Sequence, residues 1–513
     1  KKSPPRKMPG ISLPCGIAGI LGCQLVKKML ITSESMQATA PTAVSELRDS
    51  FVVFRNSQGN EARGTLLRLT RYVAVFEVYN PYSIVQLSEV LNDCRIFMAD
   101  RLVYSGRAIV SSLVNTGIML ICEAELDESW LEVDLFAPLT EPGRLRSEFA
   151  EFLKEWNRVG QILPEYKVAV ADLQTYFVDL RRWLEQVELS IRSSPTGERG
   201  LMERDVIDNL RDDVLPSIDR LFKRFEDVAD VVHPDLQPLH RTYVKRQLHP
   251  LVLCAPFAYR TYLKPLGYAG DYEMVNMILR DPHEGSSLFA KMLNVWLLAQ
   301  PSAEAHRNRV KYLANMLDTE VGRIAATGRK ARILNLGCGP AGEIQSFLTH
   351  SAVADHAEFS LLDFNDETLD YARKVLESLR QRHHRGTVLN FEKRSVHQIL
   401  KDSSRRVELP PDRQYDLIYC AGLFDYLSDR VCKRLMDHFY DLLGPGGLLV
   451  ATNVDSSNPN RNSMDFILEW HLTYRDKMEM ARLAPGAAPT EHCLVKADPT
   501  QVNIFLEVRK PYA

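Results

Sequence analysis

The glycine-rich stretch ARILNLGCGPAGE, residues 331–343, constrains the fold more than any other part of the chain. A short apolar run leads into a turn that contains Gly337, Gly339 and Gly342, and a helix-compatible segment follows over residues 343–348. A strand, a tight turn and a helix start in this order let an open α/β sheet present backbone N–H groups to an anionic part of a cofactor. Glycine permits the sharp turn and a close approach of the ligand because it has no Cβ atom. We therefore expect a cofactor-binding turn at this point.

The chain after this turn alternates between strand-like and helix-like segments. The strand patterns cover residues 358–362, 387–391, 415–420 and 448–454, and the helical patterns cover residues 369–380 and 430–443. Such alternation predicts a mostly parallel sheet with helices on both faces. Two further strand-like pieces, EHCLVKAD and VNIFLEVRK, are joined by Pro499 and Thr500 and predict a terminal antiparallel hairpin. Residues 331–513 are therefore expected to form one Rossmann-like α/β domain.

Asp363 ends the second predicted strand of this domain. In a Rossmann unit, an acid at this distance from the glycine turn accepts hydrogen bonds from the ribose hydroxyl groups of a cofactor. A carboxylate at a strand end can also be a solvent-exposed group without a ligand. The glycine spacing alone fits an NAD-binding turn as well, so other segments have to identify the cofactor.

Four segments resemble the motifs of class I S-adenosylmethionine-dependent methyltransferases. LNLGCGPAGE resembles their first motif, LLDFNDETLDYAR their second, YDLIYCAGLFDYLSD the motif of the fourth strand, and LGPGGLLVATN the turn before the fifth strand. The resemblance implies S-adenosyl-L-methionine as the cofactor in place of NAD. It implies cofactor contacts from Asn335, Gly337, Gly339, Gly342, Asp363, Phe364, Ser395 and Ala421. Two positions depart from the pattern, because Asn335 and the Arg394-Ser395-Val396 segment stand where acids are usual.

Residues 254–280 combine tyrosines and charged residues around Pro265, Gly267 and Gly270. Such a segment can simply pack between domains. It can also form a lid over a cofactor pocket, because loops on a rigid scaffold often carry a functional site. As a lid it would contribute Tyr268 and Asp271 to the cofactor site, and to the substrate site it would contribute Arg260, Tyr262, Lys264 and Tyr272.

Residues 51–124 contain short β-branched or aromatic runs separated by turn signals, which predicts a small antiparallel barrel. The pattern resembles the PilZ-type barrel, which in its ligand-binding versions senses a cyclic dinucleotide through an RxxxR pair and a [DN]xSxxG turn. Here Arg68 and Arg71 have the wrong spacing, and Asn115-Thr116-Gly117 is at best a remnant of the second motif. We therefore favour a docking or scaffolding barrel over residues 46–140 to a nucleotide sensor.

The spacing of apolar residues separates the rest of the chain into three segments. Residues 1–45 are expected to be an unstructured leader, because proline and glycine interrupt their apolar stretch. Apolar residues recur at helical spacing from residue 144 to about residue 232. This predicts a helical bundle or hairpin over residues 141–240, whose apolar stripe forms a core or the seam of a homodimer. Residues 241–330 are expected to form a helical cap that carries the lid.

The arrangement as a whole resembles the bacterial family assigned to the biosynthesis of the extracellular factor 3-hydroxypalmitic acid methyl ester. The segments that carry the resemblance are PFAYRTYLKPLGYAGDYEMVNMIL, the methyltransferase motifs, and MDFILEWHLTYRD. The resemblance extends over most of residues 50–510. It implies methylation of the carboxylate of a hydroxy fatty acid to give a quorum-sensing methyl ester.

If the methyl acceptor is a carboxylate, the site needs a particular kind of side chain. The carboxylate is ionised at neutral pH, so it requires a cation or hydrogen-bond donors to hold it rather than a general base. The candidates for this clamp are Arg260, Lys264, His471 and Arg475. A helix over residues 466–480 would place His471, Tyr474 and Arg475 on one face, with Tyr474 as a substrate contact. The alternative is that this segment is only a solvated face.

Asp425 and Tyr426 follow the fourth strand, where class I enzymes place residues near the transferred methyl group. With His471 and Arg475, they are the predicted catalytic residues. An amine or phenol acceptor would make Asp425 or His471 a candidate base, whereas a purely structural Asp425 would cap the following helix.

Composition limits the other classes of function. The net charge of -3 gives no general electrostatic attraction to nucleic acid. Nine cysteines without CxxC pairs indicate a reducing compartment, so we expect a cytoplasmic protein, and we expect neither a metal site nor a transmembrane segment. The alternative to an enzyme is a regulatory protein, in which the barrel senses a nucleotide and the methyltransferase-like core binds cofactor without turnover.

Overall fold

The structure is a computed structural model that describes residues 50–70, 72–79, 85–98, 101–115, 119–127, 146, 150, 153, 161–403, 410 and 413–512. The expected leader, residues 1–45, lies outside these ranges, and so does most of the helical pattern of residues 144–159. Arg71, Thr116 and Gly117 of the compared barrel motifs also lie outside them.

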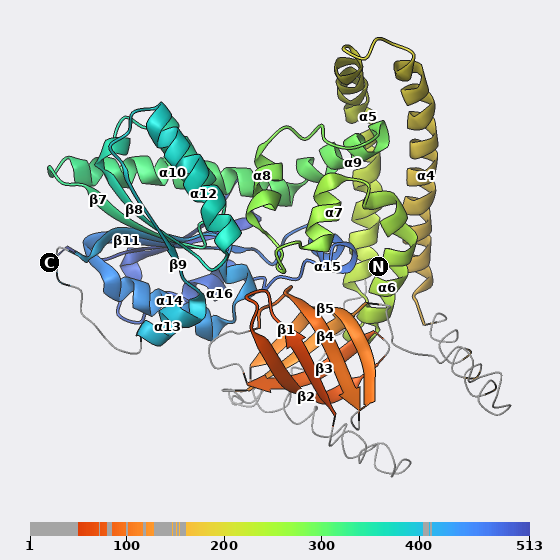
Figure 1. Ribbon diagram of the computed structural model, residues 1–513, viewed down its shortest axis with the longest axis horizontal. Helices are drawn as coiled ribbons and strands as arrows, with labels where there is room; N and C mark the ends of the chain where they lie inside the picture. The colour runs from red at the N-terminus through yellow and green to blue at the C-terminus, as the bar shows by residue number, and fades with distance from the viewer. Residues whose placement is uncertain are drawn as a thin grey trace, which may run out of the picture.

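The N-terminal part is a closed barrel of six antiparallel strands, drawn in red to orange in Figure 1. The strands are β1 (Phe51–Arg55), β2 (Glu61–Leu69), β3 (Val73–Tyr79), β4 (Val90–Met98), β5 (Arg101–Asn115) and β6 (Met119–Leu126). Their order around the barrel is β1-β2-β3-β6-β5-β4. Successive side chains of a strand point to opposite faces, so the inward ones, among them Phe54, Phe76 and Tyr104, fill the core. The predicted barrel is confirmed.

Two long helices, α4 (Pro164–Arg192) and α5 (Arg199–Asp230), form a hairpin that extends away from the rest of the molecule (Figure 1). Their apolar stripes meet each other and α6 (Gln237–Val252), where Tyr166, Phe177 and Phe225 are buried. The apolar stripe predicted for this region is therefore part of a core within one chain.

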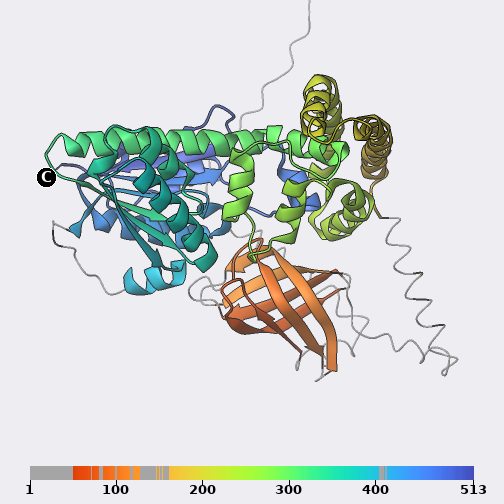
Figure 2. The same cartoon turned by 45° about the horizontal axis from the view of Figure 1, so that its top comes forward.

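Four helices lead from this hairpin to the sheet: α7 (Pro256–Leu263), α8 (Tyr272–Leu279), α9 (Leu288–Ala299) and α10 (Pro301–Ala325). Asp271 caps the start of α8, because its carboxylate accepts a hydrogen bond from the Met274 N–H at 2.9 Å. Helix α10 is straight and runs from this helical region along the sheet (Figure 2). It thus connects the cap directly to the first strand of the C-terminal domain.

The C-terminal domain contains a seven-stranded sheet in the order β12-β13-β11-β10-β7-β8-β9. Its strands are β7 (Ala331–Leu336), β8 (Ala357–Asp363), β9 (Val388–Lys393), β10 (Tyr415–Cys420), β11 (Leu443–Val454), β12 (Cys493–Ala497) and β13 (Asn503–Arg509). Strands β7 to β11 are parallel, and β13 pairs antiparallel with both β11 and β12. The predicted mostly parallel sheet with a terminal antiparallel hairpin is confirmed.

Helices cover both faces of the sheet, because neighbouring strand residues alternate between the faces. Ile333 packs with α10, α11 (Gly342–His350) and α12 (Asp366–Arg382). Leu334 packs on the opposite face with α13 (Val396–Ser403) and α14 (Asp429–Leu442). The strand order reverses between β7 and β10, which are parallel neighbours at the centre: β8 and β9 continue on one side and β11 on the other. The carboxyl ends of β7 and β10 therefore mark the expected ligand site.

The continuous helix considered over residues 466–480 does not form. The chain forms two short helices, α15 (Arg461–Ile467) and α16 (Lys477–Arg482), with a non-helical segment between them. Glu469 has a left-handed backbone with φ of 51°, which interrupts a right-handed helix. The backbone N–H of Thr473 donates to Asp425 O at 2.7 Å, so this segment pairs with the C-terminal α/β domain instead of forming its own helical hydrogen bonds. Asp476 then starts α16 through a capping box.

The barrel is joined to the rest of the chain by buried polar contacts. Arg241 of α6 pairs with Glu125 of β6. The Arg107 guanidinium of β5 donates to the Tyr262 carbonyl at 2.8 Å. The barrel therefore contacts both α6 and α7. No helix among the described residues is long and apolar enough to cross a bilayer.

Candidate functional site

The glycine turn lies at the carboxyl end of β7 and opens a pocket beneath the loop that joins α7 to α8. Gly337 and Gly339 have φ values of 69° and 52°, which favour glycine. A Cβ atom built on Gly339 meets no described atom within 4 Å, so the turn leaves open space on that side. A Cβ on Gly342 would lie 3.0 Å from Leu279 Cδ1, because α11 starts against α8.

Asp363 at the end of β8 lies beside this turn and lines the pocket. Its Oδ2 accepts from the Gly339 N–H at 3.3 Å, and its Oδ1 accepts from the Asn365 N–H at 3.0 Å. Burial raises the pKa of Asp363 to about 6, while these backbone bonds act in the opposite direction. The carboxylate is thus fixed in position, as the proposed ribose contact requires.

Sequence reasoning missed Glu343. This buried residue in the first turn of α11 lines the pocket, and its Oε1 accepts from Tyr419 Oη at 2.8 Å and from Asn335 Nδ2 at 3.3 Å. Burial raises the pKa of Glu343. It brings an acid next to Asn335, where the sequence pattern lacks one. Its position directly after Gly342 was the available signal.

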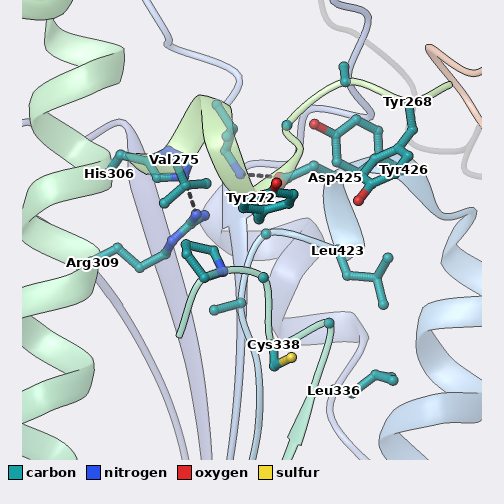
Figure 3. Close-up of a pocket in the computed structure, with 18 of the residues that line it drawn as sticks. Tyr268, Tyr272, Val275, His306, Arg309, Leu336, Cys338, Leu423, Asp425 and Tyr426 are labelled. Carbon is teal, nitrogen blue, oxygen red and sulfur yellow. Dashed lines mark hydrogen bonds between the residues drawn. The ribbon is translucent and has the colours of Figure 1, made fainter. Parts of the chain in front are cut away.

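The loop between α7 and α8 forms one wall of the pocket. Tyr268 and Tyr272 both line the pocket (Figure 3). The Tyr268 ring lies 5.0 Å from that of Phe364. The Tyr268 hydroxyl bonds to Thr368 Oγ1 at 3.3 Å, and the Tyr272 hydroxyl donates to Glu367 Oε1 at 2.8 Å. These bonds tie the α7–α8 loop and the start of α8 to α12.

Asp425 and Tyr426 line the same pocket from the segment after β10. Asp425 Oδ1 accepts from the Val454 N–H at 2.6 Å, and burial raises the pKa of Asp425. The Tyr426 hydroxyl accepts from Trp470 Nε1 at 2.9 Å, and it lies 2.7 Å from a Cβ built on Gly270. Gly270, with φ of 76°, therefore lets the α7–α8 loop approach Tyr426 closely.

His306 and Arg309 of α10, which sequence reasoning also missed, supply the basic groups of the pocket. Figure 3 shows both side chains pointing from the helix toward the cavity, on the side opposite Tyr268 and Tyr426. Arg309 donates to His306 Nε2. No described carboxylate lies within ion-pair distance of the buried guanidinium, and burial lowers the pKa of both residues. A positive charge thus faces the pocket without a salt bridge.

The structure places the predicted clamp residues of residues 254–280 elsewhere. Arg260 pairs with Asp271 at 2.9 Å, and neither lines the pocket. The Tyr262 ring packs against His249. Lys264 is buried, donates to Leu468 O at 3.2 Å, and has its pKa lowered to about 7 by burial. These residues hold the loop in place and do not reach the pocket.

His471, Tyr474 and Arg475 do not share a helix face and do not line the pocket either. His471 faces Asp465 at 3.6 Å, and the Tyr474 ring lies under the Arg461 guanidinium. Arg475 is buried and donates to the carbonyls of Phe424 and Leu427 and to Asn453 Oδ1. We assign these three residues structural roles, because the non-helical segment turns them away from the pocket.

Most of the other predicted cofactor residues line the pocket, and one does not. Asn335, Gly337, Gly339, Gly342, Asp363, Phe364 and Ala421 line the pocket, together with Arg394 and Val396. Ser395 does not, because its hydroxyl accepts from the Gln398 N–H at 3.3 Å at the start of α13.

A second, strongly apolar chamber adjoins the first pocket. Phe222 of α5, Phe257 of α7, Leu293 of α9 and Ile467 of α15 are among its lining residues. Four residues border both spaces: Ser302, His306, Met464 and Trp470. His306 therefore stands where the pocket that contains the charged side chains meets the apolar chamber.

Comparison with known proteins identifies the domain that carries the pocket. Residues 334–449 match a family described as a methyltransferase domain. This part of the chain is therefore similar to methyltransferase domains, and the match supports the S-adenosylmethionine cofactor predicted from the sequence. No curated protein matched the sequence.

Several solved structures resemble the chain distantly. A possible exported protein from Bordetella parapertussis is 17% identical, with 52% of this chain and 88% of that chain covered and a TM-score of 0.39. Magnesium protoporphyrin IX methyltransferase from Synechocystis PCC 6803 is 11% identical, with 49% and 97% covered and a TM-score of 0.31. An N-methyltransferase from Bradyrhizobium japonicum WM9 is 16% identical, with 49% and 99% covered and a TM-score of 0.28. With TM-scores below 0.5, none of these likenesses bears on the substrate of this chain.

Proposed function

We propose that this chain is an S-adenosylmethionine-dependent methyltransferase that esterifies the carboxylate of a fatty acid, of which a hydroxy fatty acid is the expected example. The observation that carries the proposal is the pair of adjoining spaces. A pocket with a buried arginine, for which no described carboxylate forms a salt bridge, sits beside an apolar chamber, and His306 borders both.

The side chains around the glycine turn fit the cofactor. Asp363 offers a fixed carboxylate to two ribose hydroxyl groups, and Glu343 offers an acid to the methionyl ammonium group. The open space beside Gly339 leaves room for the cofactor to approach the backbone. Once bound, S-adenosylmethionine supplies a methyl group on a positively charged sulfur. Asn335 and Tyr419 hold Glu343 by hydrogen bonds, so this acid is oriented in advance.

Arg309 takes the clamp role that the sequence assigned to other cations. A guanidinium binds a carboxylate through two parallel N–H groups, and in a buried site this fixes the orientation of the acid. The guanidinium of Arg309 can bind such an acid because its hydrogen-bond partner, His306, is neutral and does not compensate the positive charge. Arginine can only donate, so His306 Nε2 accepts, and the ring proton remains on Nδ1 as a further donor.

The apolar chamber accounts for the rest of the acceptor. An acid whose head lies at Arg309 can pass His306 and extend its tail among Phe222, Phe257 and Leu293. Burial of each methylene group contributes about 0.8 kcal/mol, so chain length should strongly affect binding. Small polar acids would leave the chamber unfilled.

The acceptor needs no catalytic base. Its carboxylate is already ionised, and the pocket lowers the barrier by aligning an oxygen with the methyl group and excluding water. Asp425 bonds the Val454 N–H, and Tyr426 is held by Trp470. Both residues therefore shape the pocket around the acceptor.

Incubation with methyl-labelled S-adenosylmethionine and fatty acids of graded length tests the proposal. We expect label in an organic-soluble product that mild alkali releases as methanol, because only an ester loses its methyl group in this way. Label that resists alkali would indicate methylation of a hydroxyl or amine and would refute the ester. Absence of S-adenosylhomocysteine binding in calorimetry would refute the methyltransferase assignment itself.

A further inference from the structure

One wall of the methyltransferase pocket belongs to the barrel. Gln58, from the turn between β1 and β2, lines the pocket, as do Gln86 and Leu87 from the segment before β4. Leu472 from the segment after α15 lines it as well. Residues far apart in the sequence thus enclose one space.

Buried Glu89 holds the two barrel loops together. Its Oε1 accepts from the backbone N–H of Ser57 at 2.8 Å and from the Ser57 hydroxyl, and its Oε2 accepts from the Gln86 N–H at 2.7 Å. Only 1% of Glu89 is exposed. These bonds fix the relative position of the two loops that carry Gln58 and Gln86.

The neighbouring Ser88 fixes the wall of the pocket next to the apolar chamber. Its hydroxyl donates to Glu469 O at 2.9 Å and accepts from the His471 N–H at 3.0 Å. These two groups flank Trp470, which lines both the pocket and the chamber and holds the Tyr426 hydroxyl. Ser88 is fully buried, so its hydrogen bonds to Glu469 and His471 are shielded from water.

The barrel also holds the α7–α8 loop. The Val90 N–H donates to Gly267 O at 2.8 Å, and a Cβ on Gly267 would lie 2.9 Å from Ser57 Cβ. The same barrel loops thus contact both the Trp470 segment and the Tyr268 loop.

We propose that the barrel is part of the acceptor-binding site: Gln86 and Leu87 contact the methyl acceptor, and Ser88 is a positioning residue for Trp470. This inference rests on the proposed function. Gln86 and Leu87 directly precede Ser88, which places them on the side of Trp470 and Leu472. An amide carries a donor and an acceptor without charge, so Gln86 suits an uncharged polar group of the acceptor, such as a hydroxyl. Leu87 suits the adjoining methylene groups.

Kinetics with two acids of equal length, one bearing a hydroxyl group, test the contact. We expect Gln86→Leu to raise KM for the hydroxylated acid about tenfold and to change KM for the plain acid less than about twofold. We expect Ser88→Ala to lower kcat/KM for both acids about tenfold, with the affinity for S-adenosylhomocysteine unchanged. Ser111→Ala, which removes a hydroxyl-to-carbonyl bond within the barrel, is the matched control.

A labelling experiment tests the same contact without turnover. Gln86→Cys should react with a maleimide, and a fatty acid added with S-adenosylhomocysteine should slow this reaction, as peptide mass spectrometry can follow. Thr65→Cys on the exposed side of β2 should react at the same rate throughout. Equal labelling with and without the fatty acid, or full protection by S-adenosylhomocysteine alone, would overturn the proposal. The proposed function would survive either result, because it fails only if the wild-type protein binds no S-adenosylhomocysteine or forms no ester.

Discussion

Arg309 and Asp363 lie in the same pocket, but their charges are compensated differently. Asp363 accepts two backbone hydrogen bonds, whereas Arg309 has a neutral histidine as its partner. The sequence pointed to Asp363 because strand order and motif spacing determine its position. It could not point to Arg309, because only the packing of α10 against the glycine turn brings that side chain into the pocket. The predicted clamp failed for the same reason, since composition shows which cations exist but not which way they face.

Arg309→Met should separate activity from stability. Loss of a charged hydrogen-bonding partner should lower kcat/KM for the fatty acid by about ten- to a hundredfold. Removal of a buried charge without a salt bridge should raise the melting temperature of the ligand-free protein. Arg309→Lys keeps the charge and serves as the comparison for both measurements. A fall in melting temperature with unchanged kinetics would mean that Arg309 is structural.

Asp363 should make cofactor binding depend on pH. Its pKa of about 6 lies above that of the unfolded chain, so its contribution to stability is present below the unfolded pKa and is lost as pH rises through about 6. Cofactor binding should run in the opposite direction, because ribose hydroxyls donate to the ionised form. Between pH 7.5 and pH 5, the affinity for S-adenosylhomocysteine should fall about tenfold in calorimetry. Asp363→Asn should bind weakly at both pH values, and an unchanged pH dependence in that variant would exclude Asp363 as the titrating group.

At the scale of elements, regular repeats were predictable and irregular backbone was not. The barrel strands, the long helices and the parallel sheet follow from alternation, helical spacing and glycine turns. The pattern of apolar and polar residues over 468–476 is compatible with a helix. Hydrogen bonds to β11 and to the segment between β10 and α14 nevertheless keep this stretch non-helical. Such long-range backbone pairing leaves no local signal in the sequence. That segment carries Trp470, so the sequence could not predict that Trp470 forms part of the pocket wall.

Gly270→Ala tests the close approach of the α7–α8 loop to Tyr426. The new methyl group would lie 2.7 Å from the Tyr426 hydroxyl, in a backbone with φ of 76°. We expect the loop to shift and kcat/KM to fall at least tenfold. Gly328→Ala is a matched control, because φ is 82° there and no described atom lies within 4 Å of the new Cβ. Both variants should lose about 1 kcal/mol of stability from backbone strain. Equal activity of the two would show that the contact with Tyr426 is dispensable.

At the scale of the whole molecule, buried charges join the barrel to the helices. Glu125 of the barrel faces Arg241 and Lys245 of α6, and Lys245 also pairs with Glu469 at 2.5 Å. The sequence predicted a docking or scaffolding barrel, but its strands gave no sign of which part of the chain it would contact. The contacts of Ser88, Val90 and Arg107 show that the barrel packs against the helices and the segment after α15.

Arg241→Met should destabilise the protein by about 3 kcal/mol, because it leaves Glu125 partly unpaired in a buried position. Urea unfolding followed by fluorescence measures this loss. The double variant Arg241→Met with Glu125→Gln should recover much of it, since no uncompensated charge remains. A single variant as stable as the wild type would show that Lys245 alone neutralises Glu125.

Helix α10 makes the site sensitive to the length of the chain as well as to its side chains. The helix continues without interruption from Arg309 to Ala325 and enters β7 after a short turn. Each residue of an α-helix advances about 1.5 Å and turns about 100°. A single inserted or deleted codon within this stretch would therefore swing His306 and Arg309 out of the pocket while leaving every residue type intact. Natural variation along α10 should consist of substitutions, with insertions and deletions confined to the turn before β7.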